Sequence, residues 1–170
     1  MIDQDRIARA VQEIISAVGE DPTREGLIDT PRRVAKMYAD FFQGLTEDPK
    51  HVLLTSFDEN YEDIVVFRDI SFFSICEHHF LPFFGQAHIG YIPEGRVVGI
   101  SKLVRSFEIL SNRPQVQERL TDQLVDTINE VIRPKGVAAL LKAEHLCVSL
   151  RGVEKLGSRI VTYSSRGNFV

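Results

Sequence analysis

The chain has 170 residues and a formal net charge of −4, with 44% hydrophobic and 26% charged residues. These values are typical of one globular domain and exclude a disordered chain or a coiled coil. The acidic balance argues against nucleic acid as a partner, and no apolar run approaches the ~18 residues of a membrane span. Two cysteines fit a reducing compartment, and the first residues lack the apolar core of a signal peptide. We therefore expect a cytoplasmic protein that acts without a membrane.

The first 45 residues are predicted to form two helices. Apolar residues recur at helical spacing from Asp3 to Val18. Thr30 is suited to cap a second helix with Pro31 at its first position, and Gly44 is expected to end it. Two helices bury little surface between themselves. We therefore expect them to pack on the main domain or on a neighbouring subunit.

Residues 60–170 alternate between runs of strands and runs of helices. A β-branched run begins at Ile64, and the turn Pro93–Arg96 is expected to close a hairpin between the strands on either side of it. Ser101 is expected to cap a helix through Leu110, and a longer helix follows Pro114. Its buried face is predicted from an apolar stripe at helical spacing: Val116, Leu120, Leu124, Ile128 and Val131. The last two strands are predicted over Val137–Leu150 and Ser158–Tyr163. The order ββααββ indicates an α+β domain with an antiparallel sheet.

Two short segments hold the side chains best suited to a metal. Cys76 and His79 are three residues apart, so one tight turn can aim both at one point, with His78 between them. His145 and Cys147 are two residues apart within a predicted strand, which would place them on the same face. Thiolate and imidazole ligands suit zinc. The alternative is that the cysteines are buried apolar residues and the histidines lie on the surface.

Charged and polar residues near two helix starts suggest binding sites. Lys102 and Arg105 lie on one face at the start of a helix, where backbone N–H groups favour anions, and Ser101 stands beside them. Arg151 adds a cation just after Cys147. A carboxylate beside an amide can bind a guanine edge, and this pattern occurs in the second helix at Gln117 and Glu118. Taken alone, each of these patterns is also typical of a solvated polar surface.

Several of these segments together resemble the zinc-dependent GTP cyclohydrolase I family. The resemblance runs in order from Thr30 to Phe169 and rests on separate runs of residues: TPRRVAKMY, SICEHHFLPFFGQAHIGYIP, VVGISKLVR, NRPQVQERLT, EHLCVSLRGV and RGNF. It implies a T-fold, an antiparallel four-stranded sheet with two helices on one face, here preceded by two N-terminal helices. It also implies a homo-oligomer, a decamer of two stacked pentamers, with active sites between subunits.

The resemblance also assigns roles to individual residues. The implied zinc ligands are Cys76, His79 and Cys147, and the implied catalytic histidines are His78 and His145. Contacts to GTP are implied for seven further residues: Glu118 and Gln117 at the guanine, Ser101, Lys102, Arg105 and Arg151 at the ribose and triphosphate, and Arg33 at the triphosphate.

The implied reaction is the zinc-dependent hydrolytic opening of the guanine imidazole ring of GTP. Formate leaves, and the product is 7,8-dihydroneopterin triphosphate, the first intermediate of pterin and tetrahydrofolate biosynthesis. Two other functions compete with this one. A nitrile reductase of the same fold would use Cys76 as a nucleophile with a nicotinamide cofactor, and a non-catalytic zinc-stabilised module would only bind nucleotides.

Overall fold

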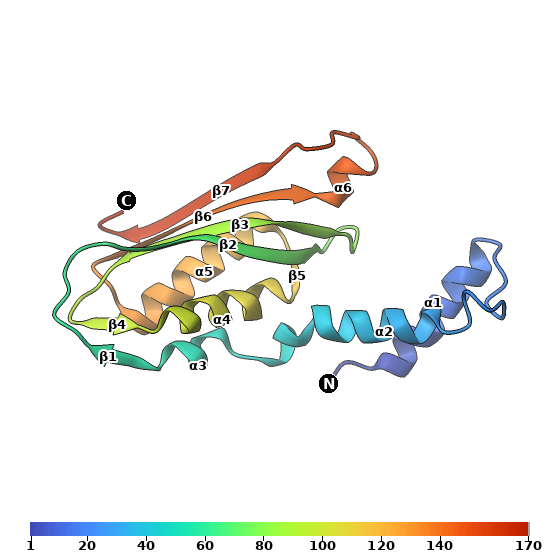
Figure 1. Cartoon of the computed structure of the whole chain (residues 1–170), viewed down its shortest axis with the longest axis horizontal. Helices are drawn as coiled ribbons and strands as arrows, with labels where there is room; N and C mark the ends of the chain where they lie inside the picture. Colours follow the sequence, from blue (N-terminus) through green and yellow to red (C-terminus); the bar gives the residue numbers. More distant parts are fainter. Residues whose placement is uncertain (170) are drawn as a thin grey trace.

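A twisted sheet in the order β5-β2-β3-β6-β7 forms one layer of the molecule (Figure 1). The computed structural model describes residues 1–169. The four long strands pair antiparallel, and the two-residue β5 joins the edge of β2 in parallel. The predicted four-stranded antiparallel sheet is therefore confirmed, with one short strand added. The strands of this sheet are β2 (Val65–Cys76), β3 (Pro82–Ile92), β5 (Pro114–Gln115), β6 (Gly136–His145) and β7 (Ile160–Gly167).

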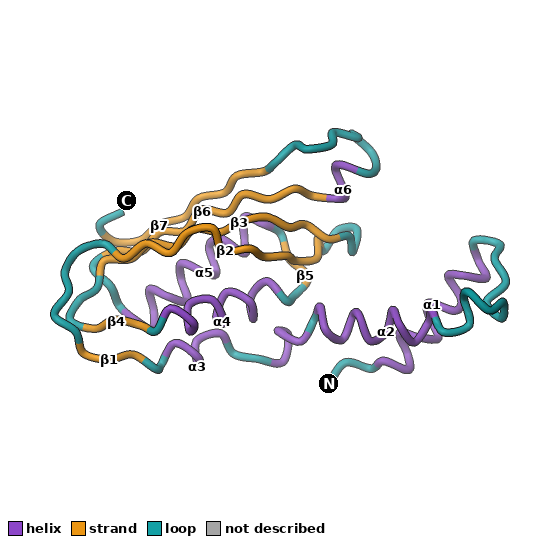
Figure 2. The backbone as a smooth tube through the Cα atoms, in the orientation of Figure 1, coloured by secondary structure: helices purple, strands orange, loops and turns teal. Residues whose placement is uncertain are grey.

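Two helices, α4 (Ile100–Ser111) and α5 (Gln117–Ile132), cover one face of this sheet (Figure 2). The predicted apolar stripe of α5 is completely buried at Leu120, Leu124 and Ile128. Alternate residues of the strands face these helices, since successive side chains of a strand point to opposite faces. They form the core together with the helices: Ile70, Phe72, Phe83, Ala87, Ile89, Tyr91, Val137, Ala139, Leu141 and Ala143. The predicted arrangement of both helices on one face is confirmed.

The N-terminal helices α1 (Gln4–Ala17) and α2 (Thr30–Phe41) form a hairpin that extends beyond the end of the sheet (Figure 1). The last turn of α2 approaches the main domain, where Phe41 lies 5.3 Å from Phe73, ring centre to ring centre. Ile14 and Val18 of the α1 stripe stay exposed. The sheet domain therefore covers part of α2 and leaves α1 open. The division of the chain at residue 45 stays a prediction.

The predicted hairpin at Pro93–Arg96 is wrong. The chain does turn there, but β4 (Arg96–Val98) pairs with β1 (Ser56–Asp58) in a separate two-stranded sheet. The reason is that β3 already has β2 on one side and β6 on the other, so neither edge is free for β4. The short helix α3 (Pro49–Leu53) leads into β1.

The helix boundaries near the predicted caps differ by one or two positions. Gly99, not Ser101, is the N-cap of α4, and Asp29, not Thr30, is the N-cap of α2. Gly44 lies within the 3₁₀ turn η1 (Gln43–Thr46) that follows α2. A Cβ atom on Gly44 would lie 2.0 Å from the carbonyl oxygen of Ile109, so this close approach to α4 requires glycine.

Candidate active site

A tight turn between β2 and β3 brings Cys76 and His79 to one place. The amide of Cys76, at the end of β2, donates to the carbonyl of Leu81 at 2.9 Å, and the amide of Phe80 donates to the carbonyl of Cys76 at 2.9 Å. Phe80 takes a positive φ of 54° to close the turn. The predicted convergence of Cys76 and His79 is therefore confirmed.

Cys147 does not lie on a strand, contrary to the prediction. Strand β6 ends at His145, and the next residues form the one-turn helix α6 (Leu146–Ser149). The strand stops there because its partners stop, since β3 begins at Pro82 and pairs with β6 only as far as Phe83 opposite His145. Helix α6, not strand alternation, brings Cys147 to the same cavity as His145.

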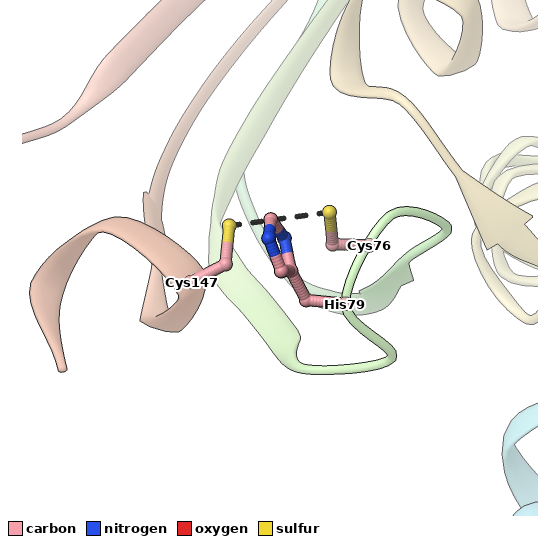
Figure 3. A group of neighbouring side chains, drawn as sticks. All are labelled: Cys76, His79 and Cys147. Atoms are coloured by element: carbon pink, nitrogen blue, oxygen red, sulfur yellow. Dashed lines mark hydrogen bonds between the residues drawn. The ribbon is translucent and has the colours of Figure 1, made fainter. Parts of the chain in front are cut away.

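The ligand atoms of Cys76, His79 and Cys147 all lie within 4.8 Å of one another (Figure 3). The two sulfur atoms are 3.9 Å apart. A tetrahedral zinc ion with Zn–S bonds of about 2.3 Å separates two sulfur ligands by about 3.8 Å. The donor set and its spacing therefore fit zinc, with a fourth position left for another ligand.

The charged and polar groups nearest to these three side chains are the other members of the cluster and Arg151. Burial, followed by the neighbouring Cys76, raises the pKa of the Cys147 thiol, and Arg151 opposes this shift. A bound divalent cation would attract both thiolates and so offset the repulsion between them. Nη1 of Arg151 lies 2.7 Å from Nε2 of His79, and because a guanidinium can only donate, this His79 nitrogen accepts.

His145 is held in a fixed plane beside this group. It is 9% exposed, and its ring stacks on Phe83 with centres 4.4 Å apart and planes 3° apart. Its Nε2 lies 2.7 Å from Oε1 of Gln117. Burial lowers the pKa of His145, and the charge of Glu118 acts in the opposite direction. His78, in contrast, has a side chain that is 66% exposed.

One cavity of about 390 Å³ connects most of the predicted site residues. Its wall includes the two histidines predicted to be catalytic, the three residues predicted to be metal ligands, and the α5 pair predicted to contact guanine. From the loop after α6 it also includes Arg151, Gly152 and Val153, and from helix α6 it includes Val148. The sequence had no signal for the apolar part of this wall. The predicted residues that line the cavity are Cys76, His78, His79, Gln117, Glu118, His145, Cys147 and Arg151.

Four predicted triphosphate contacts lie elsewhere in the chain. Ser101 and Lys102 are at the start of α4, which lies beside β4 at the end of the sheet opposite α6 (Figure 1). Arg105 lines a separate hollow with Glu108. Arg33 lies on α2, where it pairs with Asp29 at 3.2 Å. Within a single chain, these four basic or polar residues therefore lie outside the cavity that the cysteines and histidines line.

The fold and the site define an α+β protein with a cluster of two thiols and an imidazole that could hold a metal ion, and comparisons with known proteins identify its family. The model of the family "GTP cyclohydrolase I" matches residues 7–170. The chain is 51% identical over 167 residues to the GTP cyclohydrolase 1 of Streptococcus pyogenes serotype M5, covering 98% of this chain and 86% of that protein. It is 52% identical over 168 residues to the enzyme of the same name from Streptococcus mutans serotype c, covering 98% and 88%.

The chain belongs to the GTP cyclohydrolase I family. The resemblance drawn from its motifs is therefore confirmed, and neither competing function is favoured. A solved structure, the archaeosine synthase QueF-Like in the apo form, aligns with a TM-score of 0.45 at 17% identity, covering 65% of this chain and 97% of that one. That likeness is too weak to bear on function. Within residues 1–169, no helix combines the length and apolar character needed to cross a membrane.

Proposed function

We propose that this protein hydrolyses GTP to formate and 7,8-dihydroneopterin triphosphate. The observation that carries the proposal is the cavity in which Cys76, His79 and Cys147 converge beside two further histidines and Glu118. Water adds at C8 of the guanine, the C8–N9 bond breaks, and hydrolysis of the resulting formamide releases formate. The ribose opens, rearranges and closes onto the freed amine with loss of water, so that the reaction consumes one water in total.

We propose Cys76, His79 and Cys147 as the ligands of one zinc ion. The family membership and the 3.9 Å separation of the two sulfur atoms support this assignment. When bound, zinc acts as a Lewis acid and lowers the pKa of its bound water toward about 7. The two thiolates balance the charge of the ion, so the positive charge that attracts a triphosphate must come from other residues.

The remaining residues of the cavity bind the purine and move protons. Glu118, at the exposed start of α5, is suited to accept from the adjacent N–H groups of the guanine edge. Gln117 begins the same helix, but its side-chain amide already has partners within the chain. His78, which is exposed, and His145, which is buried, face the cavity from different elements. We assign them the proton transfers to and from the purine and its opened product, because an imidazole exchanges protons near neutral pH.

The separation of the basic residues supports an oligomer as the active form. Arg151 lines the cavity, but Ser101, Lys102, Arg105 and Arg33 do not. If all of them hold one triphosphate, the last four must come from neighbouring copies of the chain. Within residues 1–169, the outer edges of β7 and of most of β2 have no strand partner, and pairing of these edges between subunits would satisfy their backbone groups. A decamer of two pentamers and a cytoplasmic location stay predictions.

Incubation of the purified protein with GTP, with formate and pterin fluorescence both measured, tests the proposed function. Stoichiometric formate and dihydroneopterin triphosphate support it. Formate without pterin would indicate that the reaction stops after ring opening, and neither product would contradict the proposal. Light scattering of the same sample tests the oligomer, and a mass of one chain at micromolar concentration would contradict the shared site.

A further inference from the structure

The side-chain amide of Gln117 is buried, 1% exposed, and its orientation is determined by its neighbours. Its nitrogen donates to the carbonyl oxygens of Leu141 and Ile160, both at 3.2 Å, and to Oγ1 of Thr162 at 3.0 Å. Carbonyl oxygens only accept, so the amide nitrogen must face them. The amide oxygen, Oε1, is thereby directed to the other side.

The hydroxyl groups of Thr121 and Thr162 allow only one set of hydrogen-bond directions. Thr121 donates its hydroxyl proton to the backbone carbonyl of Gln117 at 2.8 Å. The hydroxyl oxygens of Thr121 and Thr162 are 2.7 Å apart, so Thr162 must be the donor to Thr121. Thr162 is therefore left as an acceptor for the amide nitrogen of Gln117. A rotation of the amide by 180° would place an oxygen against three acceptors and is excluded.

The fixed amide determines which nitrogen of His145 can exchange a proton. Oε1 of Gln117 lies 2.7 Å from Nε2 of His145 and can only accept, so Nε2 carries a hydrogen whether the ring is neutral or protonated. Nδ1 makes no hydrogen bond within residues 1–169. That part of the chain contains no buried side-chain nitrogen without a partner, so Nδ1 stays accessible in the cavity that His145 lines.

We propose that Gln117 is a positioning residue that makes Nδ1 the proton-exchanging atom of His145. The proposal rests on the proposed function, in which His145 transfers protons during GTP hydrolysis. It gives the Gln117 side chain a task different from contact with the guanine. The stacking of His145 on Phe83 holds the ring plane, and Gln117 determines the tautomer within that plane.

Two substitutions of Gln117 distinguish the effect of its hydrogen-bond acceptor from the effect of its packing. Gln117→Met keeps the volume but removes both polar atoms, whereas Gln117→Glu keeps an acceptor toward His145 and loses the amide donors to Leu141 and Ile160. A purely structural role predicts that Glu is worse than Met, because it places an acid against two carbonyl oxygens. The positioning role predicts the opposite order in turnover.

We expect Gln117→Met to lower kcat for formate release about 100-fold, the lower part of the range for an acid–base group. KM for GTP should change by less than about threefold, since substrate binding is not the function removed. Gln117→Glu should recover about tenfold in kcat over Gln117→Met, even where it melts at a lower temperature. Gln123→Met, which removes another α5 amide that contacts Gln115 and not His145, should behave as wild type.

Zinc content and circular dichroism are measured on every variant, so that turnover is compared among folded, loaded proteins. Wild-type kcat in Gln117→Met, or a Glu variant no better than the Met variant, would overturn the proposal. Should Gln117→Met not fold, Gln117→Leu takes its place, because it also leaves Nε2 of His145 without its acceptor, and unchanged kcat there would overturn the proposal. A wild-type protein that releases no formate would instead contradict the proposed function.

Discussion

The hydrogen bond from Arg151 to His79 predicts that Arg151→Met strengthens metal binding. His79 Nε2 accepts from Arg151 at 2.7 Å. If a metal coordinates Nε2, it occupies the lone pair that accepts this bond. If it coordinates Nδ1 instead, the proton of the neutral ring moves to Nε2, which then opposes an N–H of Arg151. In either case metal binding must break the bond, and its cost lowers the metal affinity.

The size of the effect follows from the exposure of the bond. A hydrogen bond in protein contributes about 0.5–1.5 kcal/mol, and this one is exposed to solvent, so the low end applies. We therefore expect Arg151→Met to bind zinc roughly two- to fivefold more tightly, because about 1.4 kcal/mol corresponds to a factor of ten. Loss of a positive charge beside a cation acts in the same direction, and a control must account for it.

Arg159→Met is the matched control, since it removes the same charge from the same loop but from a residue whose influence falls on Glu144. Competition with a chromophoric chelator gives the zinc affinity, and the thiolate absorption of Co²⁺ gives an independent measurement without any turnover. A second experiment compares the zinc affinity in sulfate with that in chloride at equal ionic strength. An anion that binds Arg151 and draws it away from His79 should tighten metal binding by linkage. An Arg151→Met affinity equal to that of Arg159→Met, or weaker, would refute the reasoning.

Three further substitutions test the site and its support. Cys147→Ser should lose most bound zinc by metal analysis and all formate release, and undiminished zinc would remove Cys147 from the ligand set. Glu118→Gln should weaken GTP binding roughly 10- to 100-fold, as expected for hydrogen bonds to a charged group, with zinc content unchanged; titration calorimetry measures this, and unaltered affinity would contradict the guanine contact. Gly44→Ala should lower the free energy of unfolding by about 2–3 kcal/mol in urea at fixed protein concentration, because its Cβ meets the Ile109 carbonyl oxygen at 2.0 Å; equal stability would show that η1 moves away from α4 at little cost.

The sequence by itself determined the family and the order of the long elements, and it indicated the three residues that are proposed as metal ligands. The apolar stripe of α5 predicted its buried face, because helical spacing depends only on local geometry. The three-residue separation of Cys76 and His79 predicted one turn for the same reason, and the structure has that turn. Motifs that carry chemistry within a few consecutive residues could therefore be recognised without the fold.

Only the tertiary structure decided what depends on partners distant in the chain. Strand β4 pairs with β1 because β3 has no free edge, and β6 gives way to α6 because its partner strand ends opposite His145. The separation of Lys102 and Arg105 from the cavity depends on where α4 begins relative to the sheet. Gln117 could be placed beside Glu118 from the sequence, but its task depends on acceptors in β6 and β7. The strand pairing and the contacts of Gln117 are set by which hydrogen-bonding groups remain free after the sheet has formed, and the place of α4 is set by its packing on that sheet. Both are properties of the whole fold.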